Sequence, residues 1–324
     1  MSTQLDFPET LHETITYFAD DDSAFEFVRG FRWLNGEAQC PDCNSKDALF
    51  LPSGKVWKCK ECARKFSLKI GTIFEDSPIK LGVWLCAFWM AVNAKNGISS
   101  YEIHRALGVT QKTGWFMLQR IRLALQNGSI VKFKGTVEAD ETYIGGKARN
   151  MHRGKRKAAG TGGAGKTAVQ GLLERHSGDK TSKKASRVVL NVVANTKRET
   201  VQGNVRKYVL KGAEVFTDEL KSYNGLGREY VHEFVNHAET YVRGKVHTNG
   251  LENFWALLKR CIKGTHVSIE PFHLFRYLDE QAFRFNERKD NDQGRFLKAV
   301  FGIIGRRLTY KSLIGDNDGL PATA

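Results

Sequence analysis

The sequence predicts a mixed α/β domain in the C-terminal half of the chain, behind a small metal-stabilised unit and a helical block. Two Cys-x-x-Cys pairs fall within a short polar segment near the N-terminus. Apolar residues then recur at helical spacing. From residue 134 onward, short runs rich in β-branched residues alternate with helical patterns, which is typical of a sheet covered by helices.

The chain has 324 residues and a formal net charge of +15, so it is long enough to bury one large core or two to three smaller ones. The charge is uneven, because residues 1–28 hold seven acidic residues and neither Lys nor Arg. A basic surplus in the remainder indicates a polyanionic partner. A solvated basic surface explains it equally well until a motif shows where the charge is used.

The start of the chain is acidic and lacks the basic and apolar stretches of a signal peptide. The longest apolar run, residues 81–92, is shorter than the roughly twenty residues that a membrane-spanning helix needs, and it predicts a buried helix. We therefore expect a cytoplasmic protein with no membrane partner.

Changes in composition divide the chain into segments. We expect a helical lead-in at 1–32, a metal-binding unit at 33–70, a helical block at 79–128, an α/β domain at 134–290 and a C-terminal tail at 291–324. Within the α/β domain the predicted strands are 136–144, 168–174, 187–194 and 214–217. The predicted helices are 199–210 and a long stretch, 247–286. The glycine- and lysine-rich residues 145–166 are expected to form a mobile loop.

The cysteine pairs predict a structural zinc site. Each pair has two intervening residues, fifteen residues separate the pairs, and the ligands are Cys40, Cys43, Cys59 and Cys62. A hairpin over 48–57 brings the pairs together in a tetrahedron with no open position for chemistry. The alternative is two chance pairs of buried cysteines. The isolated Cys86 and Cys261 are expected to be core residues.

Residues 99–122 predict two helices joined at Gly108, as in a helix-turn-helix. Thr110 would cap the second helix. The residues at its N-terminal end, where a recognition helix contacts a DNA groove, are Gln111, Lys112 and Thr113. The alternative is a helical hairpin that only packs against its neighbours.

Three acidic residues stand where strands and a helix can bring them together. Asp140 interrupts a run of β-formers, Asp218 follows the apolar strand 214–217, and Glu252 lies in a predicted helix seven residues before Lys259. Two-metal phosphoryl-transfer sites need carboxylates that converge in this way. Taken singly, each acid is more often a solvated surface charge, and only the ordered set favours a metal site.

Other residues compete with this set. Asn249 lies one helical turn before Glu252, and we favour the carboxylate because a hard Mg²⁺ prefers charged oxygen and because its register matches that of Lys259. Glu138 would share the strand face of Asp140 as a supporting group, whereas Glu141 would point away.

Taken together, these motifs resemble the DDE transposases of bacterial insertion sequences, specifically the ISXO-like group with a zinc ribbon in front. The resemblance covers nearly the whole chain. It is carried by Cys40-Pro-Asp-Cys43 with Cys59-Lys-Glu-Cys62, Asp140-Glu-Thr-Tyr-Ile-Gly-Gly146, Thr217-Asp218 before Tyr223, His247-Thr-Asn-Gly-Leu-Glu-Asn-Phe-Trp255 with Leu258-Lys-Arg260, and Gly264 with Phe283-Arg-Phe-Asn-Glu-Arg288.

The resemblance implies a ribonuclease-H-like catalytic domain that binds Mg²⁺ or Mn²⁺ through Asp140, Asp218 and Glu252. It implies cleavage of DNA at the terminal inverted repeats of an element and strand transfer to target DNA. Lys259 and Arg260 would contact DNA phosphates. Two or more subunits would hold the two ends, and the protein would be associated with the bacterial nucleoid.

Two other functions compete with transposition. One is a zinc-ribbon DNA-binding regulator whose transposase domain is inactive. The other is an ATP-driven enzyme, because residues 160–167 match the Walker A pattern, including Lys166. A phosphate loop opens a helix, whereas residues 168–174 predict a strand, so a basic loop near DNA explains the match more simply.

Overall fold

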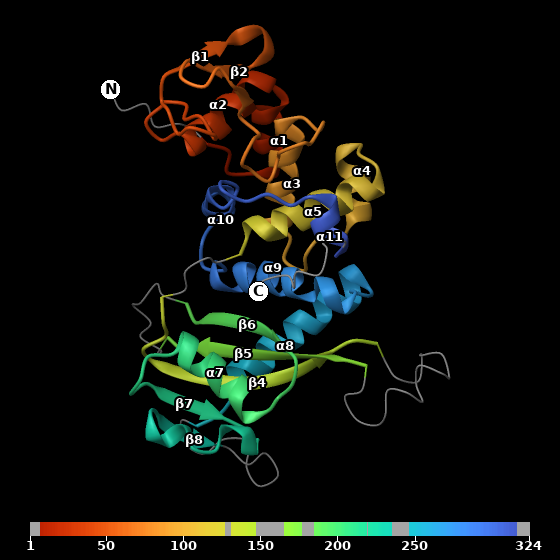
Figure 1. Cartoon of the computed structure of the whole chain (residues 1–324). Helices are drawn as coiled ribbons and strands as arrows, with labels where there is room; N and C mark the ends of the chain where they lie inside the picture. Colours follow the sequence, from red (N-terminus) through yellow and green to blue (C-terminus); the bar gives the residue numbers. More distant parts are fainter. Residues whose placement is uncertain are drawn as a thin grey trace. The chain divides into compact units, whose positions relative to one another are not determined.

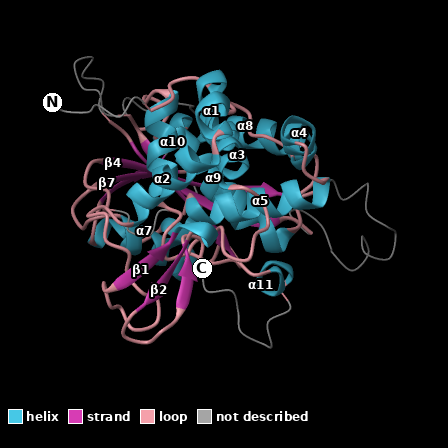
Figure 2. Cartoon of the chain, turned by 90° about the horizontal axis from the view of Figure 1, so that it is seen from above, coloured by secondary structure: helices cyan, strands magenta, loops and turns pink. Residues whose placement is uncertain are grey.

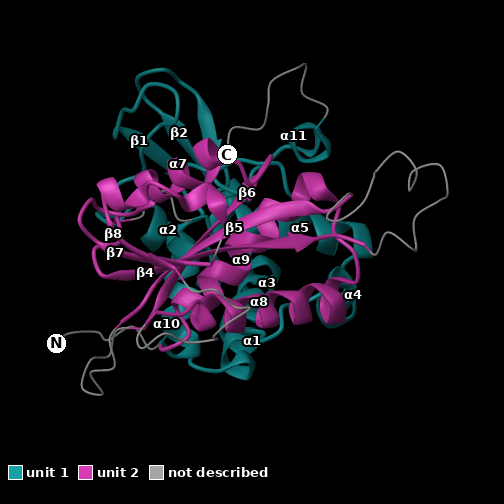
Figure 3. Cartoon of the chain, turned by 90° about the horizontal axis from the view of Figure 1, so that it is seen from below, with its two compact units in different colours: residues 1–126, 290–324 teal, residues 127–289 magenta. Residues whose placement is uncertain are grey.

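The computed structural model describes residues 7–126, 131–146, 165–176, 185–218, 220–234 and 246–315. Its contacts divide the chain into two compact units (Figure 3), Met1–Gln126 with Asp290–Ala324, and Asn127–Lys289. Each unit has its own sheet, with three strands in the first and five in the second (Figure 2). The first unit is therefore assembled from two separate stretches of the chain.

The first unit is mainly helical. Its helices are α1 (Leu11–Ala19), α2 (Asp21–Arg32), α3 (Leu81–Asn93), α4 (Ser100–Leu107), α5 (Gln111–Ala124), α10 (Asp292–Phe301) and α11 (Tyr310–Ile314). The predicted buried helix is confirmed as α3, with nine of its thirteen residues buried. In the part of the chain that the structure describes, no helix is both long and apolar enough to span a bilayer.

An aromatic cluster holds the first unit together. Phe296 of α10 is fully buried, with its ring 5.8 Å from that of Phe27 and 5.3 Å from that of Trp89. The segment expected to be a tail, 291–324, thus supplies helices α10 and α11, and α10 forms part of this core. Changes in composition along the chain did not reveal this return to the first unit.

The small sheet of the first unit is an antiparallel ribbon of β1 (Ala48–Leu51), β2 (Val56–Cys59) and β3 (Lys65–Ser67). The predicted hairpin is confirmed, with β1 beside β2 (Figure 2). A 3-10 turn over Pro52–Gly54 joins the two strands. Phe25 of α2 stacks on Trp57 at 5.7 Å, so the lead-in helix covers one side of the ribbon.

The two predicted helices that join at Gly108 are also confirmed, as α4 and α5. Gly108 ends α4 with a φ of 66°, a left-handed conformation that favours glycine, and Thr110 caps α5 by accepting a hydrogen bond from the N–H of Thr113. Most of α5 from Met117 onward is buried. The one fully exposed side chain of α5 is that of Lys112, in its first turn.

The second unit contains a five-stranded sheet in the order β6-β5-β4-β7-β8. Its strands are β4 (Thr136–Ile144), β5 (Thr167–Glu174), β6 (Arg187–Val193), β7 (Glu214–Thr217) and β8 (Val231–Phe234). The first three pair antiparallel, whereas β4, β7 and β8 run parallel. The four predicted strands are confirmed, β8 was not predicted, and the arrangement is consistent with a ribonuclease-H-like transposase domain.

Helices cover both faces of this sheet (Figure 1). On one face, α7 (Arg198–Tyr208) buries Val201 and Val205 against Val137 and Ala139 of β4. On the other face lie α8 (Asn249–Cys261) and α9 (Leu274–Asn286), which pack against alternate residues of β5 and β6. Successive residues of β4 consequently face two different helical layers.

The predicted continuous helical stretch 247–286 is wrong. After α8 the chain forms a π-helical turn over Ile262–His266 and then stops being helical at Val267, whose φ is 63°. A β-branched residue rarely adopts this backbone conformation, and no helix continues through it. Helical structure resumes with a 3-10 turn that begins at Pro271.

Gly171 of β5 allows α8 to approach the sheet closely. It pairs with Asp140 across β4 and β5. A Cβ atom at this position would lie 2.7 Å from the ring of Trp255 and 2.8 Å from Leu251. The missing side chain therefore provides the space in which two residues of α8 sit.

We expect Gly171→Ala to destabilise the second unit by roughly 1–3 kcal/mol, because the added methyl group displaces Trp255. Gly203→Ala is the matched control. It lies inside α7, where a Cβ atom would meet no described atom within 4 Å, and alanine in a helix interior should stabilise by roughly 0.5–1 kcal/mol. Urea unfolding of both variants measures the difference, and equal stabilities would contradict the role given to Gly171.

Candidate active site and cysteine cluster

The four cysteines meet in the first unit. The Sγ atoms of Cys40 and Cys62 are 3.6 Å apart, those of Cys43 and Cys59 are 3.5 Å apart, and all four lie within 4.8 Å of one another. Four thiolates in this arrangement suit a closed tetrahedral zinc site. The cluster supports the structural zinc that the spacing predicts.

The two cysteine pairs fold into matching turns. The N–H groups of Cys40 and Cys59 each donate over 2.9 Å to the carbonyl five residues later. The residue after the second cysteine of each pair is left-handed, with φ of 59° at Asn44 and 58° at Ala63. Each turn thus presents its two thiols to the same point.

In the second unit, adjacent parallel strands bring two of the predicted acids together. The pairing of β4 with β7 ends at Ala139 opposite Thr217, so Asp140 and Asp218 come next on each strand. Asp218 accepts a hydrogen bond from the N–H of Leu220 at 3.1 Å, which orients its carboxylate at the end of β7.

The third acid stands on α8. At about 100° per residue, Glu252 and Lys259 lie about 20° apart around the helix axis, while Asn249 lies about 60° from Glu252 on the side away from the buried face. Glu252 and Asn249 are both exposed. The register predicted for Glu252 and Lys259 is thus present on one continuous helix.

Asp140 is half-buried and has two hydrogen-bond donors. Its Oδ2 accepts a hydrogen bond from Nε1 of Trp255 at 2.8 Å, and its Oδ1 accepts one from the N–H of Glu141 at 2.8 Å. Burial raises the pKa of Asp140 to about 6, and the negative charges of Asp218 and Glu252 add to this rise. The charges of Asp218 and Glu252 thus act on Asp140, although burial is the larger cause of the rise.

The carboxylates form a looser group than the cysteines. Among the described residues, the four cysteines are the one group of three or more His, Cys, Asp or Glu side chains whose ligand atoms come together as a metal site would need. Asp140, Asp218 and Glu252 do not form such a group in this structure.

Glu138 connects β4 to the start of α8. It is 1% exposed, and its Oε2 accepts a hydrogen bond from the N–H of Leu251 at 2.8 Å, in the first turn of the helix. Nε of Arg175 donates to its other oxygen at 2.5 Å. A carboxylate at a helix N-terminus is favoured by the helix dipole, so Glu138 fixes the position of α8 on the strand that carries Asp140.

Glu141 lies on the opposite face of β4, as predicted. The hydroxyl of Tyr223 donates to its carboxylate, and Tyr223 belongs to the core that packs against α7. Burial raises the pKa of Glu141 to about 8, with Asp218 and Asp140 adding to the rise. The sequence indicated the direction of Glu141 but gave no signal for its partner, which is 82 residues away.

The predicted DNA-contacting residues have different surroundings. In α5, Nε2 of Gln111 donates to Ser100 at 2.8 Å, Lys112 is exposed, and the N–H and hydroxyl of Thr113 bond to Thr110. In α8, Lys259 is half-buried and Arg260 is exposed. Lys112 and Arg260 are thus the most accessible of the five.

Most of the predicted loop 145–166, with the start of the Walker-like segment, lies outside the described residues, which resume at residue 165. Lys166 is exposed, and Thr167 begins β5, so the chain enters a strand where a phosphate loop would open a helix. This confirms the expected strand and removes the structural context for nucleotide binding.

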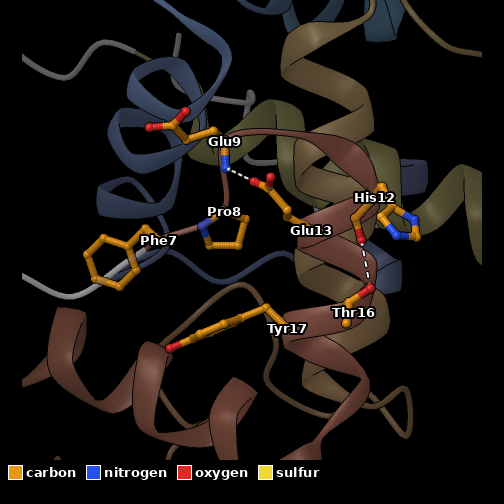
Figure 4. Close-up of a pocket in the computed structure, with 7 residues that line it drawn as sticks. All are labelled: Phe7, Pro8, Glu9, His12, Glu13, Thr16 and Tyr17. Carbon is orange, nitrogen blue, oxygen red and sulfur yellow. Dashed lines mark hydrogen bonds between the residues drawn. The ribbon is translucent and has the colours of Figure 1, made fainter.

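Two cavities differ in what lines them. One, of about 580 Å³, lies beside α1 in the first unit and is lined by Phe7, Pro8, Glu9, His12, Glu13, Thr16 and Tyr17 (Figure 4). Glu13 there accepts a hydrogen bond from the N–H of Glu9 and belongs to the cap of α1. The other, of about 350 Å³, lies in the second unit and includes Asp218.

Comparison with known proteins identifies two domains in the chain. The family described as the ISXO2-like transposase domain matches residues 132–286, and the transposase zinc-ribbon domain matches residues 19–65. An uncharacterised protein in transposable element ISH50 of Halobacterium salinarum is 28% identical over 300 residues, which cover 87% of this chain and 95% of that protein. An uncharacterised transposase-like protein of Haemophilus influenzae is 32% identical over 111 residues, which cover 34% of this chain and 89% of that protein.

We expect Cys59→Ser to lose zinc, which should release Trp57 from its stacking on Phe25, because metal binding and folding of such a ribbon are coupled. Metal content measured by mass spectrometry and a red shift of tryptophan emission report the two effects. Cys86→Ala is the control, since this buried thiol lies outside the cluster. Full zinc content in Cys59→Ser would rule out the tetrahedral site.

Glu141→Gln tests the half-buried acid on the far face of β4. Its pKa is raised from 4.5 to about 8, so the folded chain holds a proton that the unfolded chain loses, and stability falls as pH rises between these values. In metal-free buffer, the variant should be as stable as the wild type near pH 4.5. Its stability relative to the wild type should then increase as the pH rises to 8. Glu229→Gln, which removes a carboxylate paired with Arg206, should show no such gain. Thermal unfolding across this pH range measures both.

Proposed function

Because the chain belongs to the ISXO-like group of insertion-sequence DDE transposases, we propose that it cuts DNA at the ends of an element and joins those ends to target DNA. The reaction class is phosphoryl transfer, in which enzymes act by positioning and by stabilising charge. Element ends are recognised as terminal inverted repeats.

One observation carries this proposal. Asp140 and Asp218 stand at the ends of adjacent parallel strands, and the hydrogen bonds of Glu138 and Asp140 to α8 hold the helix that carries Glu252 against the same strand. Burying one carboxyl group beside two other acids costs folding free energy unless a cation neutralises them. A folded chain retains such an arrangement where a ligand compensates for it.

The donor set fits a divalent cation. Asp140, Asp218 and Glu252 supply oxygen ligands of the kind that Mg²⁺ and Mn²⁺ prefer, and their mutual repulsion favours a cation between them. Bound there, such an ion would supply Lewis-acid chemistry for attack on a DNA phosphate.

The surrounding residues hold these acids in position. Trp255 directs one oxygen of Asp140 through its indole N–H, and Glu138 fixes the start of the helix that carries Glu252. Lys259 lies on the same flank of α8 as Glu252, and in this proposal it binds the phosphate of the strand being cut. Arg260 extends this basic surface.

The first unit supplies DNA recognition in this proposal. The zinc ribbon and the α4–α5 pair bind the inverted repeats, with Lys112 and the exposed residues of α4 in contact with DNA. Because both ends of an element must be processed together, the active assembly contains at least two subunits. In this proposal, residues 134–290 form the catalytic domain, as predicted from the sequence, and the residues before them recognise DNA.

We expect Asp140→Asn, Asp218→Asn and Glu252→Gln each to lower the rate of end cleavage and strand transfer at least a hundredfold, because loss of a metal-binding carboxylate removes several kcal/mol of transition-state stabilisation. Asn249→Ala should have a smaller effect. The measurement is strand transfer in Mg²⁺ with a plasmid carrying the element ends and flanking sequence. Glu199→Gln, an exposed acid on the first turn of α7, is the matched control.

The same variants separate transposition from regulation. If the wild type binds the element ends yet none of the three substitutions changes any DNA-dependent activity, while Cys59→Ser abolishes binding, then the protein is a zinc-ribbon regulator with an inactive catalytic domain. Should Asn249→Ala be as harmful as Glu252→Gln, the third ligand would have to be reassigned.

A further inference from the structure

The cavity of about 350 Å³ in the second unit lies at the carboxyl ends of two parallel strands. It is bounded by Thr217 and Asp218 at the end of β7, by His232 and Phe234 of β8, and by residues of the segment between them. Its volume is at the lower end of the range of about 300–1,000 Å³ that small-molecule sites occupy. Only Asp218 among its lining residues has a role in the proposed catalysis.

A hydrogen-bond pair defines the chemistry of the cavity wall. The hydroxyl of Thr217 donates to the carbonyl of Asp218 at 2.8 Å and lies 3.0 Å from Nε2 of His232. A hydroxyl has one proton, so Nε2 of His232 must donate to Thr217. Burial lowers the pKa of His232, so the imidazole is neutral at pH 7 and its Nδ1 is a hydrogen-bond acceptor.

The other lining side chains are suited to a flat aromatic ligand. Phe234 at the end of β8 is 54% exposed, although it is a large apolar ring, and it offers a stacking surface. Leu220 adds an apolar contact, and the exposed Asn224 can donate and accept through its amide. The ammonium group of Lys221 is exposed at the same site.

We propose that this cavity binds an unpaired nucleobase of the DNA strand whose phosphate lies at Asp218. The base stacks on Phe234, and its edge bonds to His232 and Asn224. Lys221 binds the adjoining phosphate. This inference rests on the proposed function, since it assigns to the DNA substrate a second point of contact beside the carboxylates.

A nucleobase suits the cavity better than a phosphate does. The Asp218 carboxylate and the neutral imidazole disfavour an anion inside it, and Lys221 is the one cation among the described residues that line it. Stacking on an aromatic side chain tolerates any base, because every base has a π-face. An unpaired base at the cut site also keeps the strand from sliding through the active site.

The experiment uses the full-length protein and a single-stranded oligodeoxynucleotide with a central 2-aminopurine, in Ca²⁺, an ion that binds carboxylate oxygens. We expect binding to change the 2-aminopurine emission. Phe234→Leu should abolish that change and weaken binding roughly tenfold, because base–aromatic stacking is lost. Phe234→Tyr should restore both. Phe272→Leu, an exposed aromatic residue of the same unit outside the cavity, should behave as the wild type.

The outcomes separate this inference from the proposed function. An unchanged emission and affinity in Phe234→Leu would overturn the cavity assignment, whatever the cleavage activity of the protein. If the wild type neither cuts nor joins DNA and the emission still depends on Phe234, the cavity assignment holds and the proposed function fails. A signal that depends equally on Phe272 would also overturn the assignment, because stacking would then be non-specific.

Discussion

The attachment of one helix to one strand determines the architecture of the second unit. Two residues of β4 accept hydrogen bonds from α8, and both bonds are 2.8 Å long. Glu138 accepts from the N–H of Leu251, and Asp140 accepts from the indole N–H of Trp255. Two strand residues advance about 6.6–6.8 Å and one helical turn about 5.4–6 Å, so the two bonds have nearly the same spacing on both elements. Gly171 makes room for the contact. The position of every other candidate ligand on α8 follows from it.

This attachment concentrates acidic groups in a strand that has helices on both faces. Glu138 is neutralised by Arg175, whereas, within the described part of the chain, Glu141 bonds to the hydroxyl of Tyr223 and Asp140 to an indole and a backbone N–H. Glu141 and Asp140 therefore lower the stability of the folded chain at the place where the proposed chemistry occurs. Active sites often carry this kind of local cost, and the surrounding core compensates for it.

Much of this organisation could be predicted from sequence because the signals are local. Cysteine spacing, the glycine between α4 and α5, and runs of β-branched residues all follow from backbone geometry over a few residues. The features that were not predicted depend on contacts with residues far away in the sequence or on a local break that the pattern hides. Strand β8 has four residues, with His232 and Glu233 in its middle, and only its pairing with β7 identifies it. The break at Val267 carries no glycine or proline at that position, so the periodic pattern concealed it.

The chain leaves the first unit after residue 126 and re-enters it at residue 290. The second unit is thus inserted into the first, whose aromatic core lacks Phe296 until the insertion has been synthesised. During translation, domains fold roughly in the order in which they leave the ribosome. The unit that contains the zinc ribbon is therefore the first to begin synthesis and the last to be completed. A translation product that ends within the second unit therefore presents a first unit that lacks α10.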